Sequence, residues 1–261
     1  MRMKQRIGTI LTTLFLIGQV FAQGTTTSDF FTEIKNYDLS AVMMADSIFA
    51  NEDEMRERAE ILGFIGDNYQ RLFVHFISII QNPLNHYEYF AYGKTKVKEN
   101  ICSFQGIIKI TKSRLYKEVD IPVDSEGLPD YKQGYAECEV YLYEDRKEKL
   151  AGFFSGKLKM GFLIDNKGEF RYDAIRFYSD GFSNNQFVGF WTSYSTKSTK
   201  RSHWGDWRIP ESGDLDIGAG EFSIDDKYVK NGWENYMLAW VYYETPEGKI
   251  ARQKEKEKWW K

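Results

Sequence analysis

The sequence predicts a mostly β protein, in which antiparallel strands follow one another as a meander and form a barrel or a strongly curved sandwich. Three observations support this fold class. Aromatic residues are abundant, with 17 Tyr, 19 Phe and 7 Trp, and aromatic side chains favour pleated sheets. Most apolar segments alternate with polar residues at a period of two, and turn-forming residues separate them. The sequence does not alternate strands with long helices, as a parallel α/β fold would.

The N-terminal segment has the pattern of a cleavable secretory signal peptide. Three basic residues precede an uncharged stretch over residues 7–21, which is shorter than the roughly 20 residues that a membrane-spanning helix needs. Val20 and Ala22 place small residues before the expected cleavage point. We therefore expect removal of residues 1–22 and a periplasmic or extracellular mature protein. The alternative is an uncleaved N-terminal membrane anchor.

Composition excludes several classes of function. Cleavage after Ala22 would leave 239 residues with a formal net charge of −6, so the mature chain has no electrostatic reason to bind nucleic acid. Two cysteines and three scattered histidines are too few for the usual zinc sites. We therefore expect no metal and no cofactor. The mature chain also lacks an apolar run of 18 residues, so we expect no integral membrane segment.

Before the β domain, we expect a polar lead-in and a helical segment, together covering residues 23–66. Within this region, residues 38–62 are expected to be helical. Acidic residues precede two arginines in the stretch NEDEMRERAEIL, and Gly63 follows it as a stop signal. This order fits the helix dipole and the preference for glycine after the last turn.

The antiparallel β domain is expected to cover residues 67–261. Residues 71–80 form a continuous apolar run, which predicts a strand covered on both faces. Further strands are expected over residues 87–97, 101–116, 134–143, 150–164, 169–178, 186–195 and 234–243. Long loops are expected over residues 117–133 and 198–221, and a charged tail ends the chain.

A membrane-spanning barrel is the competing architecture, and it requires an apolar outer face on every strand. The faces opposite the predicted core instead carry charged residues, which are Lys94, Lys96, Glu137, Glu139, Lys157 and Lys159. A lipid-facing band is therefore hard to assemble from these strands.

Cys102 and Cys138 lie on the apolar faces of two predicted neighbouring strands. They could form a disulfide if their Cα atoms lie within about 7 Å. The alternative is a pair of free buried thiols that act as small apolar side chains. A catalytic thiol is disfavoured, because an apolar environment raises the thiol pKa.

The segment TKSTKRSHWGDWR interleaves basic and aromatic residues. Its Trp204, Trp207 and Arg208 could grip an anionic ligand or a sugar ring from a loop. The alternative is that both tryptophans fold back onto the sheet. Trp191 and Trp240 lie on the last predicted strands, where they would line a cavity in a barrel or belong to the core of a sandwich.

Two further features have ordinary structural explanations. Asp214, Asp216 and Glu221 superficially resemble a calcium loop, but the EF-hand spacing fails. The alternatives there are an irregular calcium site and a surface loop with solvated carboxylates. His75 lies in phase with apolar residues of its strand, so we expect a hydrogen-bonded core histidine.

These observations favour a secreted or periplasmic, non-enzymatic binding protein that presents aromatic residues to a small apolar ligand or a glycan. It would have an apolar pocket lined by residues such as Trp191 and Trp240. The first alternative, an envelope protein–protein interaction module, predicts a filled core and a contiguous exposed apolar patch. The second, a carboxylate-based hydrolase, predicts two carboxylates in one cleft, at least one with a raised pKa.

Overall fold

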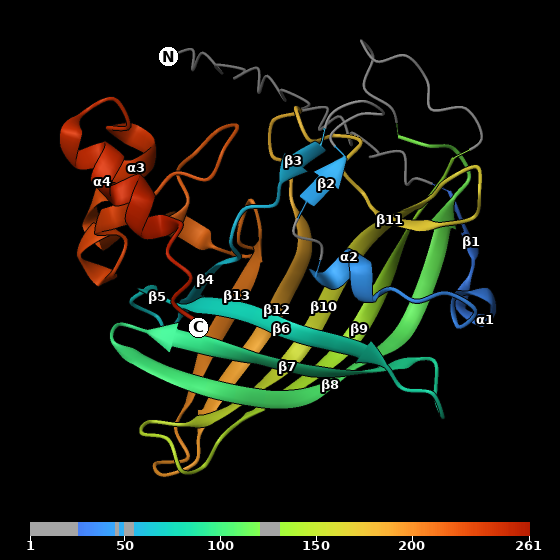
Figure 1. Ribbon diagram of the computed structural model, residues 1–261, viewed down its shortest axis with the longest axis horizontal. Helices are drawn as coiled ribbons and strands as arrows, with labels where there is room; N and C mark the ends of the chain where they lie inside the picture. Colours follow the sequence, from blue (N-terminus) through green and yellow to red (C-terminus); the bar gives the residue numbers. More distant parts are fainter. Residues whose placement is uncertain (1–25, 45–46, 50–54, 121–130) are drawn as a thin grey trace, which may run out of the picture.

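The computed structural model describes residues 26–44, 47–49, 55–120 and 131–261. The predicted signal peptide lies outside the described residues. Within them, the fold is dominated by an 11-stranded antiparallel sheet that curls into a half-barrel (Figure 1). The predicted mostly β fold class is thereby confirmed, with a strongly curled sheet and few helices.

The strands of the half-barrel pair mostly with their neighbours in the chain. The main path runs through β5 (Gln70–Arg71), β4 (Leu62–Ile65), β13 (Thr199–Asp206), β12 (Asn184–Ser193), β10 (Gly152–Ile164), β9 (Lys132–Glu144), β8 (Asn100–Tyr116), β7 (Glu88–Val97) and β6 (Phe73–Gln81). At its margins, β1 (Thr27–Asp29) pairs with β8, and β11 (Phe170–Tyr172) pairs with β10. A separate pair consists of β2 (Ser47–Phe49) and β3 (Met55–Glu57).

Helices are short and lie at the two ends of the described chain. They are α1 (Phe31–Ile34), α2 (Ser40–Met44), α3 (Glu234–Val241) and α4 (Pro246–Glu255). Two 3-10 turns, Gly213–Leu215 and Asp226–Asn231, precede α3. None of the helices in the described ranges is both long enough and apolar enough to cross a membrane.

The inward faces of the central strands agree with the predicted alternation. Cys138 on β9 lies opposite Ile110 on β8 and Leu158 on β10, and all three side chains are buried. Because the side-chain period of a strand is two, this register turns a whole row of apolar residues toward the concave side. The alternating patterns of β7 to β10 thus account for most of the sheet's contribution to the core.

The concave side of the half-barrel is filled by the chain's own N-terminal segment. Ile34, Leu39 and Val42 are fully buried and belong to the same apolar core as the inward residues of the sheet. Figure 1 shows α2 lying inside the curl. Hydrogen bonds hold the segment in place, because the Leu39 N–H donates to the Tyr89 hydroxyl at 3.1 Å.

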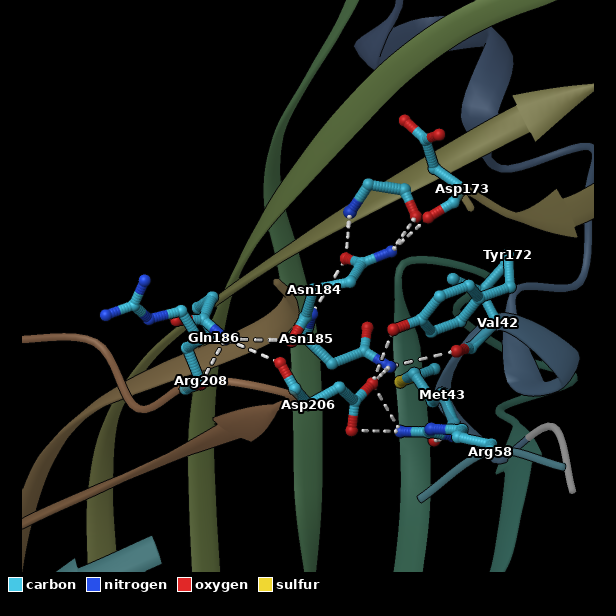
Figure 2. A network of polar contacts seen from close by, with 11 residues as sticks. Val42, Met43, Arg58, Tyr172, Asp173, Asn184, Asn185, Gln186, Asp206 and Arg208 are labelled. Carbon is cyan, nitrogen blue, oxygen red and sulfur yellow. Dashed lines mark hydrogen bonds and ion pairs between the residues drawn. The ribbon is translucent and has the colours of Figure 1, made fainter. Parts of the chain in front are cut away.

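A buried polar network also ties this segment to the sheet (Figure 2). Arg58 and Asp206 form an ion pair at 2.9 Å, and both side chains are almost fully buried. The Tyr172 hydroxyl and the Asn185 amide each donate to the same carboxylate at 2.9 Å. Burial raises the pKa of Asp206, while the Arg58 charge and these donors oppose that rise.

A second apolar core lies under the C-terminal part of the chain. Its buried residues are Leu62, Phe64, Tyr69, Ile209, Leu215, Phe222, Ile224 and Trp233. Two contacts fasten the C-terminal residues to the sheet: Arg71 pairs with Glu255 at 2.5 Å, and the Trp260 ring stacks on His75 at 3.6 Å. The His75 side chain is 22% exposed and packs under Trp260, so the expectation of a core histidine is wrong.

The helix predicted over residues 38–62 is wrong beyond its beginning. Residues 40–44 are helical, but β2 and β3 follow as strands, and residues 50–54 lie outside the described part. Ile48 is buried in the core from its extended segment, and Arg58 reaches Asp206. These tertiary contacts override the local helical signals.

The C-terminal strand predicted over residues 234–243 is wrong, because residues 234–241 form α3. The decisive spacing is helical: Tyr236 contacts Trp233 and Trp240 through its ring, at centroid distances of 6.0 and 6.1 Å. Residues three and four apart share one helix face. The expected charged tail likewise begins with a helix, α4, capped by Thr245.

Three predictions need smaller corrections. The loop expected over residues 198–221 begins with β13, whose Ser202 and Trp204 are buried between neighbouring strands. The strand expected over residues 169–178 shrinks to the three residues of β11. The strand expected from residue 150 begins at Gly152, and Leu150 is exposed in a turn with a positive φ of 55°.

The run predicted to be covered on both faces is covered on one. Ile77 and Ile80 of β6 are exposed on the outer side, while Val74 and Ile79 are buried. A bulge between Phe76 and Ser78 shifts the alternation in this strand.

Candidate functional site

Trp191 and Trp204 belong to the interior of the half-barrel. The Trp204 ring stacks on Phe187 with centroids 3.6 Å apart. The Trp191 indole N–H donates to the buried Glu144 carboxylate at 2.9 Å. Both side chains are thus occupied by protein contacts in the core.

The other three predicted binding residues each have different partners or surroundings, although Trp207 and Arg208 are neighbours in the chain. Trp207 packs against the rings of Phe177 and Phe182. Arg208 forms an ion pair with Asp216 at 2.6 Å. Trp240 lies on α3 and is half exposed. The structure therefore does not assemble one aromatic site from the five residues.

Cys102 and Cys138 are both free and buried. Cys138 lies opposite Ile110, far along β8 from Cys102, so the disulfide considered from the sequence is not formed. Burial raises the pKa of Cys102 to about 12 and raises the pKa of Cys138 as well. Both thiols therefore serve as apolar core groups.

The carboxylates that resemble a calcium loop have other partners. Asp216 pairs with Arg208, and Asp214 pairs with Lys227 at 2.7 Å. Among the described residues, no group of three or more potential ligands is placed to hold a metal ion.

A cavity of about 420 Å³ lies on the outer face of the sheet, beside the end of β10. Four separate segments form its wall. The lining residues are Tyr116, Asp120, Gln133, Gly134, Tyr135, Lys159, Gly161, Asp173, Arg176, Ser179, Asp180, Gly181, Phe182, Ser183, Asn184 and Gln186. This is the candidate site, and it combines aromatic rings, amides and charges of both signs.

Two tyrosines supply the aromatic side of the cavity. The Tyr116 and Tyr135 rings lie 5.8 Å apart, tilted by 43°. The Lys159 ammonium lies 4.5 Å from the centre of the Tyr135 ring, within cation–π range. Burial raises the pKa of Tyr116, so its hydroxyl stays protonated at neutral pH and can donate a hydrogen bond.

Amide side chains order the polar side. The Gln133 amide joins two acidic residues, because its oxygen accepts from the Asp120 N–H at 2.8 Å and its nitrogen donates to Asp173 at 2.7 Å. Asn184 brackets Gly161 by accepting from its N–H at 2.7 Å and donating to its carbonyl at 3.0 Å. Figure 2 shows Asn184 reaching toward Asp173. The amides are thus fixed in orientation before any ligand arrives.

The two acidic residues have opposite electrostatic environments. Burial raises the pKa of Asp173, and the nearby Asp120 charge adds to that rise. Hydrogen bonds from Arg176 lower the pKa of Asp120. Asp173 is therefore the more easily protonated of the pair.

Sequence reasoning missed this cavity because its residues are far apart in the chain. The strand register brings distant residues together, since Tyr135 lies opposite both Arg114 and Gly161. Two predicted residues do support the wall from behind. Trp207 packs on Phe182, and the Arg208 carbonyl accepts from Gln186 at 2.9 Å.

An aromatic band occupies another part of the outer face. Its members are large apolar side chains, each 37 to 61% exposed: Ile80, Phe90, Tyr92, Ile107, Tyr141, Tyr143 and Phe190. Cross-strand pairing makes the band continuous, because Ile107 lies opposite both Phe90 and Tyr141. Contiguous exposed apolar patches often mark interaction or ligand-binding sites.

Comparisons of the chain with protein-family models, curated proteins and solved structures return no match.

Proposed function

We propose that this protein is a glycan-binding protein that acts outside the cytoplasm, with the cavity around Tyr135 and Asp173 as its sugar site. The observation that carries the proposal is the pairing of aromatic and amide groups in one cavity. Sugar rings offer apolar C–H faces and many hydroxyl groups. Tyr116 and Tyr135 would contact the faces, while Gln133 and Asn184 would sit beside the hydroxyls.

The charge balance of the cavity favours a neutral ligand. Arg176 already pairs with Asp120, and Lys159 lies over the Tyr135 ring. Asp173 has a raised pKa, which reduces its charge at mildly acidic pH. An anionic or cationic ligand would therefore find no concentrated opposite charge.

The filled half-barrel favours a glycan over the small apolar ligand. Residues such as Leu39 and Val42 occupy the space in which a barrel protein would enclose such a ligand. The proposed extracellular location rests on the N-terminal sequence pattern.

A panel of neutral disaccharides tests the proposal. It would contain units of glucose, galactose, mannose, xylose and N-acetylglucosamine, with binding measured by titration calorimetry. We expect at least one to bind the wild type and to lose roughly tenfold or more in affinity to Tyr135→Ala, since a tenfold loss corresponds to about 1.4 kcal/mol. Trp240→Ala, an exposed ring on α3, is the matched control and should bind normally. Absence of binding across the panel contradicts the proposal.

A carboxylate-based hydrolase is the second candidate, and the Asp120–Asp173 pair favours it. Environments that push two carboxyl pKa values apart are the usual basis for separate acid and base roles. Asp173 would then protonate a leaving oxygen, and Asp120 would act as the base or nucleophile. Release of nitrophenol from aryl glycosides, lost in Asp173→Asn without loss of sugar binding, would support hydrolysis. No release by the wild type would exclude it for those substrates.

A further inference from the structure

The aromatic band has a regular spacing across the strands. Phe90 lies opposite Ile107, and Ile107 lies opposite Tyr141. On the other side, Ser155 lies opposite both Tyr141 and Phe190. Aromatic rings therefore occupy every second strand of one row. Because neighbouring strands are about 4.8 Å apart, successive rings start from backbone positions about 10 Å apart.

A second row broadens the band on one side. Tyr92 and Tyr143 both lie opposite Gln105, and Tyr143 lies opposite Phe153. The Tyr143 and Phe153 rings stack with centroids 6.0 Å apart. This contact holds the Tyr143 ring in place, so less conformational freedom is lost there when a ligand binds.

The charged row on the other side is electrically balanced. Lys109 lies opposite both Glu88 and Glu139, and Lys157 also lies opposite Glu139. Lys109 and Glu88 approach to 3.9 Å. Charges of alternating sign give the margin of the band no preference for an anionic or a cationic partner.

The shape of the sheet restricts the partner further. Figure 1 shows the sheet curling across its strands, so a row that crosses the strands follows an arc on the convex side. A flat, rigid surface could reach only part of such an arc. A second copy of the same convex face would fit poorly for the same reason. A flexible chain can follow the arc.

We propose that the band is a second subsite, which binds a neutral, extended β-1,4-linked glycan chain along the row of Phe90, Tyr141 and Phe190. In such a chain the repeating disaccharide is about as long as the roughly 10 Å between the backbone positions that carry successive rings. Equivalent sugar faces would therefore meet successive rings. This inference rests on the proposed glycan function and deepens it, because it makes a polymer the preferred ligand. A disaccharide reaches one ring, whereas a hexasaccharide reaches all three.

Oligomer-length titrations test this subsite. The probes are β-1,4-linked dimers and hexamers of glucose and of N-acetylglucosamine. For the wild type we expect one hexamer to bind roughly tenfold or more tightly than its dimer, as linked contacts allow. In a Tyr141→Ala, Phe190→Ala double variant, that gain should disappear while the dimer affinity stays unchanged. Ile101→Ala is the control, since Ile101 is exposed on the same face outside the band.

The outcomes separate the two proposals. Dimer binding without any hexamer gain overturns the band subsite and leaves the cavity standing. A gain that survives in the double variant also overturns it. If no sugar of either length binds, the glycan function fails together with the band subsite. If the band instead captures an exported protein, with that binding lost in the double variant and no hexamer gain, the band is a protein interface. Thermal melting of each variant checks that its fold is intact.

Discussion

Arg58 and Asp206 form a buried ion pair, with a nitrogen and a carboxylate oxygen 2.9 Å apart. It joins the segment after β3 to the end of β13, so two distant parts of the chain meet at one carboxylate. The Met43 carbonyl also accepts from Arg58, at 2.8 Å. The N-terminal segment is therefore held in the half-barrel by charge as well as by apolar packing.

We predict that Arg58→Met destabilises the protein by about 3–5 kcal/mol, because it leaves the buried Asp206 carboxylate without its counter-charge. Chemical denaturation measures the change. A double variant, Arg58→Met with Asp206→Leu, should recover much of the loss, since no buried charge remains. Arg201→Met, which breaks an exposed pair with Asp67, is the control and should change stability little. Equal effects from the two single variants would contradict this account.

The pH dependence of the free energy of unfolding should reveal the raised pKa of Asp173. Its pKa is raised in the folded protein, so between the unfolded and folded pKa values the native state binds more protons. The stability that the Asp173 carboxyl contributes is fully present below its pKa in the unfolded chain, about 3.9. This contribution is lost as the pH rises through its pKa in the folded protein. The free energy of unfolding of the wild type, relative to Asp173→Asn, should therefore fall as pH rises through that window. A relative stability that rises with pH would contradict the raised pKa.

Replacing Trp204 or Trp240 with alanine should lower the free energy of unfolding by very different amounts. Trp204→Ala should cost about 3–5 kcal/mol, because the ring is buried and stacked on Phe187. Trp240→Ala should stay within about 0.5 kcal/mol, because half of its surface faces solvent. Equilibrium unfolding of both variants provides the comparison. A mild effect at Trp204 would mean that its ring is not part of the core.

Gly161 offers a way to fill the cavity without removing a polar group. A Cβ at this position would meet Asp173 and Asn184 at ordinary contact distances of 3.4 to 3.5 Å, so Gly161→Ala should fold. Its methyl group would occupy the space between these side chains. We expect loss of disaccharide binding with a melting temperature close to that of the wild type. Unchanged affinity in a folded variant would move the sugar site elsewhere.

The sequence predicted those parts of the fold that depend on local alternation. The strands around Cys102, Cys138 and Phe154 have their apolar faces where a period of two places them. The prediction failed where tertiary contacts determine the local structure. The polar residues of β13 led to the prediction of a loop, but Trp204 and Ser202 pack between strands.

Local sequence patterns could not predict the candidate site. Tyr135 and Asp173 are brought together by the strand register and by the Gln133 and Asn184 amides, and neither has a distinctive sequence neighbourhood. The loop with Trp207 and Arg208 did attract notice for its aromatic and basic residues. Its place is behind the cavity wall, which no spacing along the chain reveals.

The most direct test of the central claim is to map the sugar contact by NMR, using the disaccharide from the panel that binds with highest affinity. Side-chain amide signals of Gln133, Asn184 and Gln186 report on the cavity without any mutation. We predict that these signals shift on titration, together with the backbone amide of Gly161. Shifts confined to α3 and α4, with the cavity amides unchanged, would contradict the claim that this cavity binds the glycan.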